Sequence, residues 1–134
     1  MVNTVVQKTG KRKTTVARAT LVKGKGIIRI NNQSIETYFN NELLVLKLTE
    51  PLVISGFKDK YDIKVNVFGG GVSSQVDAIR QAIARALVEI TGSDDLKAKF
   101  IAYDRALIVS DTRFKEMKKP NNSQARAKRQ KSYR

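Results

Sequence analysis

The sequence predicts an α+β fold in which helices cover a mostly antiparallel sheet, followed by an extended basic tail. Segments rich in Val and Thr, and one segment of strict apolar alternation, favour strands. A long segment repeats its apolar residues every three or four positions, as helices do, and the C-terminal segment has almost no apolar side chains. We place a globular domain at residues 1–111, with the order β-β-β-α-α-β-α-α-β, and the tail at residues 112–134.

The first two strands are predicted from β-branched content. Thr4–Lys8 and Thr14–Val22 are rich in Val and Thr, which favour the extended backbone. Between them, Gly10 is followed by three consecutive cations, Lys11, Arg12 and Lys13, and we expect these four residues to form a turn. The turn is either a solvated hairpin tip or a phosphate contact, and the lack of any acid on either side favours the contact.

A third strand and a short helix are expected next. Gly24-Lys25-Gly26 is typical of a hairpin turn and leads into the apolar strand Ile27–Ile30. Asn31-Asn32 closes that strand. Ser34 then provides a cap for a short helix that runs through Phe39.

The following segment predicts a helix with unusually many apolar residues. Asn40 or Asn41 provides the cap for Glu42–Glu50, and apolar side chains occupy most of its circumference. Such a helix is expected to be buried or packed between elements. Pro51 either ends the helix or begins its next turn, and Gly56 is the stop signal.

Tyr61–Phe68 is the clearest strand, because its apolar and polar residues alternate. Three glycines, at 69–71, connect it to the longest helix. The apolar residues between Val72 and Ile90 form a single stripe, and Arg80 and Arg85 lie off that stripe.

The end of the domain is expected to hold one more helix and one more strand. Gly92 ends the long helix, and Ser93 or Asp94 begins a short helix through Ala102. Ala106–Val109 is expected to be a last short strand.

Charge is distributed unevenly along the chain. The net charge is +14, yet residues 36–116 carry nearly equal numbers of acidic and basic side chains. Residues 1–35 and 117–134 hold Lys and Arg without a single acid. Two acid-free arms on a near-neutral body indicate a polyphosphate partner, and a segment as apolar-poor as the tail needs such a partner to become ordered.

The residue types argue against an enzyme. The chain has no His and no Cys, which removes the commonest general base, nucleophile and metal ligands, and its acids are scattered. No GxGxxG fingerprint is completed after Gly26, and Gly69-Gly70-Gly71 lacks the Lys-Ser/Thr ending of a P-loop. We therefore expect no catalysis, no cofactor, no metal and no small-molecule substrate. No signal peptide or membrane segment is indicated, so we expect a cytoplasmic protein.

Several motifs together resemble the universal small-subunit ribosomal protein nine family, in its archaeal and eukaryotic form. They are Gly10-Lys11-Arg12-Lys13-Thr14 with Ala17-Arg18-Ala19, Phe68-Gly69-Gly70-Gly71, residues 81–87 (QAIARAL), Tyr103-Asp104-Arg105 and the ending at residues 129–134 (RQKSYR). The resemblance covers essentially the whole chain, and the short N-terminus is more similar to the archaeal form. Residues 121–125 depart from it, because the family usually has glycines and more Arg there.

The resemblance implies a fold similar to the second domain of small-subunit ribosomal protein five, with a left-handed βαβ crossover. It also implies a structural role in the head of the small ribosomal subunit, next to other head proteins, with the tail reaching peptidyl-site tRNA. The residues expected nearest tRNA are Lys131, Ser132, Tyr133 and Arg134. The residues expected to contact rRNA are Lys8, Lys11, Arg12, Lys13, Arg18, Gly69, Gly70, Gly71, Ser73, Lys118, Lys119, Arg126, Lys128 and Arg129.

Three points stay open at this stage. The three glycines serve either as a tight turn or as a phosphate contact at a helix N-terminus with Ser73, and both roles are compatible. A non-catalytic protein subunit of an RNA-processing ribonucleoprotein is the alternative function, because the protein subunit of ribonuclease P shares the general fold. A free-standing nucleic-acid chaperone is a third possibility, and it would bind unrelated RNAs and DNAs nearly equally.

Overall fold

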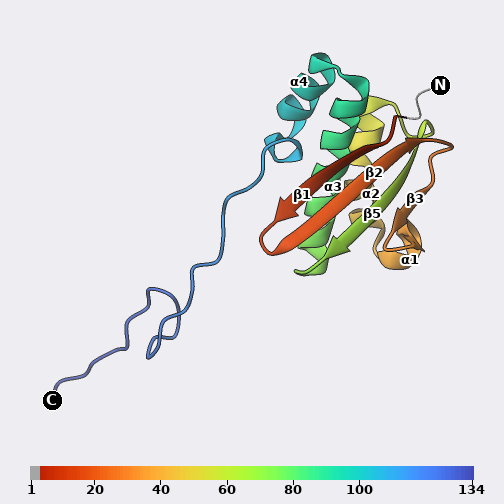
Figure 1. Ribbon diagram of the computed structural model, residues 1–134. Helices are drawn as coiled ribbons and strands as arrows, with labels where there is room; N and C mark the ends of the chain where they lie inside the picture. The colour runs from red at the N-terminus through yellow and green to blue at the C-terminus, as the bar shows by residue number, and fades with distance from the viewer. Residues whose placement is uncertain (1–3) are drawn as a thin grey trace.

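The structure, a computed structural model, describes residues 4–134 and has a single mixed sheet with helices on one face (Figure 1). This arrangement confirms the predicted α+β class. The elements in chain order are β1 (Val6–Arg12), β2 (Thr15–Lys23), β3 (Ile28–Ile30), β4 (Gln33–Ser34), α1 (Ile35–Tyr38), α2 (Glu42–Ser55), β5 (Tyr61–Phe68), α3 (Val72–Thr91), α4 (Asp94–Tyr103) and the 3₁₀ helix η1 (Arg105–Leu107).

The strands lie in the order β1-β2-β5-β3-β4, and every neighbouring pair is antiparallel except β3 with β5. The parallel pair is connected through α1 and α2. In Figure 1, β3 and β5 both point downward, β3 lies to the right of β5, and α2 lies behind the sheet. When this view is turned so that both strands point up, β5 lies to the right of β3. The chain passes behind the sheet from β3 to β5, which is a left-handed crossover.

The core lies between the sheet and α3, which packs across β1 and β2. Strand alternation turns small residues of β2, Ala17 and Ala19, toward the helix, and both are fully buried. Gly10 of β1 allows a close approach of the helix: a Cβ there would lie 2.7 Å from Ala82 N and would also overlap Ala78 O. Gly10 is therefore needed for packing rather than for a turn.

The predicted helix boundaries are confirmed by their caps. The side chains of Ser34, Asn41 and Ser93 each accept a hydrogen bond from a backbone amide in the first turn of the helix that follows. Gly56 and Gly92 end α2 and α3 in the left-handed conformation that glycine adopts without strain. α2 is one continuous helix through Pro51, which decides between the two roles considered for that residue.

Two turns differ from the expectations. β1 continues through Lys11 and Arg12, so only Lys13 and Thr14 form the turn to β2. Gly24-Lys25-Gly26 is not a hairpin turn, because β5 lies between β2 and β3. The strand beside β2 comes from residues 61–68, and the spacing of two glycines carries no information about a segment so far along the chain.

Two further features differ from what the sequence indicates. Ala106–Val109 is not a strand, because residues 105–107 form η1 and Asp104 caps it by accepting a hydrogen bond from Ala106 N. The sequence predicts that α2 is buried or packed between elements, and its inner side does pack against α3 and α4, but its outer side is not covered within the described residues. The short strand β4, formed after the Asn31-Asn32 turn, was not predicted.

Candidate nucleic-acid interface

The β1–β2 turn and the three-glycine loop meet at one end of the sheet, although they are more than fifty positions apart. Thr15 Oγ1 donates a hydrogen bond to Gly69 O at 3.2 Å, and a Cβ on Gly69 would lie 2.8 Å from Thr14 O. Lys13 is exposed in the turn, and Ser73 is exposed in the first turn of α3. The structure therefore brings together two of the segments that the sequence predicts to contact RNA.

The three glycines have different roles. Gly69 and Gly70 have φ angles of +79° and +61°, and a side chain on Gly70 would overlap Thr15 Oγ1. Gly71 has ordinary extended backbone at the N-cap of α3, open space around it, and no side chain that caps the helix. The tight-turn role is thus correct for the first two, and the open helix N-terminus begins at the third.

The face of the sheet opposite the helices is exposed and basic. Alternation places Lys11, Arg18, Lys64 and Arg29 on this face, from four different strands. Arg29 and Lys64 are paired across β3 and β5. We call this surface, defined by these four side chains, the open basic face.

Asp62 is the single acidic residue within the five strands, and it is engaged locally. Its Oδ1 accepts hydrogen bonds from the backbone amides of Lys25, Gly26 and Ile27, at 2.8, 3.0 and 3.0 Å. The bonds from Ile27 and Lys25 hold the pKa of Asp62 below its ordinary value. Its negative charge therefore stabilises the β2–β3 loop at the edge of the open basic face.

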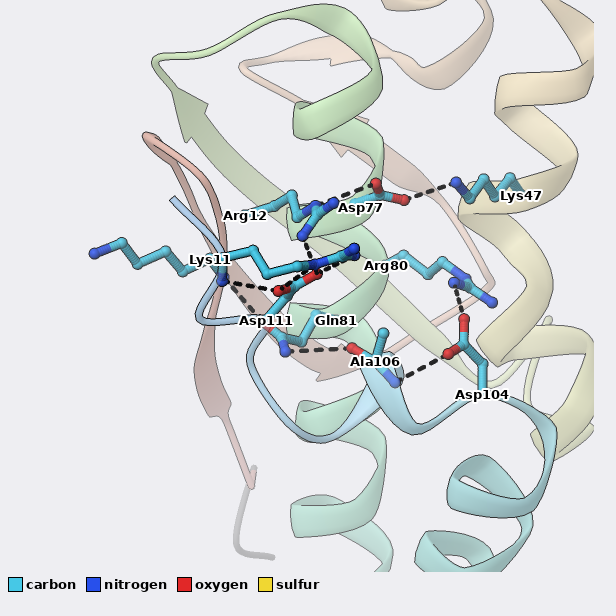
Figure 2. Close-up of a pocket in the computed structure, with 10 residues that line it drawn as sticks. Lys11, Arg12, Lys47, Asp77, Arg80, Gln81, Asp104, Ala106 and Asp111 are labelled. Atoms are coloured by element: carbon cyan, nitrogen blue, oxygen red, sulfur yellow. Dashed lines mark hydrogen bonds and ion pairs between the residues drawn. The ribbon is translucent and has the colours of Figure 1, made fainter. Parts of the chain in front are cut away.

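Arg12 is placed differently from the other cations of the first arm. It lines a cleft of about 280 Å³ (Figure 2), where it pairs with Asp111 and lies 3.9 Å from Asp77. Asp77 also forms an ion pair with Lys47 of α2, whose Nζ lies 2.8 Å from Asp77 Oδ1. Arg12 has no acid near it in the sequence, but it has two near it in the fold, because α3 and the segment after η1 supply them.

The same cleft contains a buried cation that the sequence analysis did not select. Arg80 is almost completely buried and pairs with Glu50 of α2 at 2.5 Å and with Asp104 at 2.8 Å. Burial by itself raises the pKa of Asp104, but hydrogen bonds from Ala106 and Arg80 outweigh it and lower that pKa. Arg80 thus connects α2, α3 and the end of α4, and it is not available to a nucleic acid.

Arg85 and Gln81, also on α3, fix the point where the tail leaves the domain. Arg85 donates to Ile108 O at 2.9 Å, to Ser110 Oγ at 3.0 Å and to Thr9 O at 3.0 Å. The position of Arg85 off the apolar stripe was the one sequence signal that it does more than pack, and no such signal was noted for Gln81. Because β1 is the edge strand, the bond to Thr9 O also covers a backbone carbonyl that has no neighbouring strand on that side.

Beyond Asp111 the chain extends away from the domain (Figure 1), and residues 112–134 form no helix or strand. Glu116 pairs with Lys119 at 3.6 Å and with Arg126 at 2.8 Å, so part of the tail charge is balanced locally. Near the domain, Lys11 Nζ lies 5.2 Å from the ring centroid of Phe114. The remaining predicted contact residues of the tail are exposed: Lys118, Lys128, Arg129, Lys131, Ser132, Tyr133 and Arg134.

The predicted residues are therefore not gathered into one pocket. Lys8 is on the helix side of β1 and lies 3.4 Å from Glu89. Lys11 and Arg18 are on the open basic face, Arg12 is in the cleft, and Lys13 is at the end of the sheet. A surface spread over a face, an end and a tail suits a large polyanion better than a small ligand.

Comparison with known proteins decides the family. The sequence profile described as "Ribosomal protein S9/S16" matches residues 10–134. The chain belongs to this family. It is 48% identical to "Small ribosomal subunit protein uS9" of Methanococcus maripaludis strain S2 over 97% of this chain and 98% of the relative. The protein of the same name from strain C7 is 47% identical over the same shares.

This membership in the ribosomal protein S9/S16 family confirms the resemblance drawn from the motifs, including its archaeal character. Within residues 4–134, no group of three or more acidic side chains is placed to hold a metal ion, His and Cys being absent from the sequence. None of the described helices combines the length and the hydropathy that crossing a membrane requires.

Proposed function

We propose that this protein is a structural constituent of the small ribosomal subunit that binds rRNA through its domain and extends its tail toward peptidyl-site tRNA. The observation that carries the proposal is the separation of charge: acids gather in the cleft around Arg12 and Arg80, while the open basic face and the tail end present cations. The relatives named above carry the name of a small-subunit protein.

The domain would hold rRNA at two adjoining places. At the end of the sheet, Lys13 and the helix N-terminus at Gly71 and Ser73 provide a cation and free backbone amides for a phosphate. On the open basic face, Lys11 and Arg18 provide further phosphate contacts. Lys8 and Arg12 are already paired with acids within the fold. They would contribute to rRNA binding through the positive potential of the domain, or by exchanging their carboxylate partners for phosphates.

The tail would gain its fixed shape from RNA. Ordering its backbone costs about 1–2 kcal/mol per residue, and phosphate contacts and counterion release offset that cost. Lys118, Lys128 and Arg129 would follow rRNA, and the terminal residues 131–134 would approach tRNA. Tyr133 is 88% exposed and offers a ring for stacking or a hydroxyl for a phosphate.

The protein would act without catalysis, in the cytoplasmic ribosome, with neighbouring head proteins as further partners. Co-sedimentation tests this. Tagged protein expressed in an archaeal host should migrate with the small subunit through a sucrose gradient. The same fractions, analysed without removing protein, should contain the small-subunit rRNA. Association with a separate processing RNA would instead support the alternative as a subunit of a processing ribonucleoprotein. Equal binding of unrelated RNA and DNA would indicate a chaperone.

A further inference from the structure

The outer side of α2 carries an exposed apolar stripe. Leu43, Leu46 and Val53 are 74%, 63% and 66% exposed, whereas Leu48 and Leu52 on the inner side are fully buried. Spacings of three and seven residues place the three exposed side chains on one side of a helix. α2 therefore has two apolar sides, and the described part of the chain covers only the inner one.

The charges near the N-terminal part of this stripe are acidic. Glu36 and Glu42 line a hollow of about 510 Å³ together with Phe39, Asn40, Val45 and Leu46. The other two charged residues of α2 are used inside the fold, because Lys47 pairs with Asp77 and Glu50 with Arg80. An apolar surface whose free charges are acidic is unusual in a chain with a net charge of +14.

We propose that this stripe and its hollow are the docking site of a neighbouring ribosomal protein, through a segment with both apolar and basic side chains. An exposed apolar surface of this kind marks a protein contact, and the two carboxylates are complementary to a cationic segment. RNA is disfavoured at this surface, because phosphates are repelled by Glu36 and Glu42 and gain nothing from Leu43 or Leu46.

The position of the stripe permits both kinds of contact at once. α2 lies behind the sheet in Figure 1, on the side opposite the open basic face. The domain would therefore connect rRNA on one side to a basic protein on the other. The inference rests on the proposed function, since it takes the partner from the same particle.

Site-specific photocrosslinking in intact small subunits tests it. A benzophenone amino acid is placed at position 46, on the stripe, or at position 22, on the open basic face, where Val22 is 38% exposed. We expect the adduct from position 46 to be a ribosomal protein, attached near a Lys- or Arg-rich segment. An rRNA adduct, or none, from position 46 would overturn the inference. The adduct from position 22 tests the proposed function separately, because it should be rRNA.

A charge-matched pair of variants tests the chemistry of the partner. Leu46→Glu and Leu46→Lys remove the same apolar side chain and introduce opposite charges. If the partner is basic, we expect Leu46→Lys to reduce the retention of this protein in salt-washed subunits by about tenfold more than Leu46→Glu. Equal losses, or a greater loss for Leu46→Glu, would contradict a basic partner. Because Leu46 is exposed in the isolated chain, both variants should retain its unfolding temperature and its affinity for free rRNA.

Discussion

Gln81 and Lys11 are 70 positions apart, and the Gln81 side chain accepts a hydrogen bond from the Lys11 backbone amide at 2.9 Å. The same side chain donates to Ala106 O at 3.3 Å (Figure 2). One nearly buried amide on α3 therefore joins the edge strand of the sheet to the segment from which the tail begins. This connection fixes the direction in which the basic tail leaves the domain.

Replacing Gln81 with Ala should loosen that connection. We expect the free energy of unfolding to fall by about 1 kcal/mol, because the partly buried Lys11 amide and Ala106 carbonyl lose their partner. We also expect the Lys11 amide to exchange hydrogen faster. Urea unfolding and hydrogen–deuterium exchange measure the two effects. Gln7→Ala is the control, because Gln7 is exposed on β1. Unchanged protection of the Lys11 amide would show that the hydrogen bond contributes little.

Gly10→Ala should be among the most damaging single-methyl changes in the domain. The added Cβ would overlap the backbone of α3 at Ala78 and lie 2.7 Å from Ala82 N. Backbone cannot move aside as a side chain does, so we expect a loss of about 3 kcal/mol of stability. Gly71→Ala is the matched control, since nothing lies within 4 Å of its Cβ. Equal melting temperatures for the two variants would contradict the packing described for Gly10.

Asp111 should make stability depend on pH on the acid side. Hydrogen bonds from the side chain and backbone of Arg113 hold its pKa well below the ordinary value of 3.8, and Arg12 adds to the effect. A pKa lowered by folding stabilises the fold fully above the unfolded pKa, and this contribution is lost as pH falls below it. Asp111→Asn should therefore lower the melting temperature at pH 6 and have a smaller effect near pH 3. Asp59→Asn is the exposed control, and a pH-independent difference would refute the linkage.

Lys11 and Lys13 should contribute directly to the salt dependence of rRNA binding. Changing both to Ala is expected to weaken binding and to flatten the slope of log affinity against log salt by about 0.9 per lost phosphate contact. Arg12 is left in place, because it is paired with Asp111. Lys97→Ala with Lys99→Ala, two exposed cations of α4, is the charge-matched control. A slope that changes equally in both double variants would indicate a general charge effect rather than contact by this segment.

Removing residues 131–134 should affect tRNA and leave assembly intact. The deletion takes away Lys131, Tyr133 and Arg134, all exposed at the end of the tail, and none of them supports the domain. We expect small subunits that contain the shortened protein to sediment normally and to bind peptidyl-site tRNA more weakly. Filter binding at moderate salt measures this against subunits with the full chain. The same tRNA affinity in both would rule out a terminal contact.

The particular elements show which predictions a sequence supports. The alternation in residues 61–68 and the apolar stripe of residues 72–90 were sufficient for β5 and α3, because a strand and a helix each repeat a local pattern. The caps Ser34, Asn41 and Ser93 were also predictable, since each bonds to amides only two or three positions away. Gly24-Lys25-Gly26 was misinterpreted as a hairpin turn because the strand that lies beside β2 comes from far along the chain.

By itself, the sequence determined the α+β class, the helix ends, the acid-free arms and the family. Only the tertiary structure decided which cations are exposed and which are paired with acids. Arg12 and Lys13 are neighbours in the chain, yet Arg12 faces Asp111 and Asp77 while Lys13 is exposed. The physical reason is that charges interact through space over a few ångströms, and folding places acids from distant segments at that range.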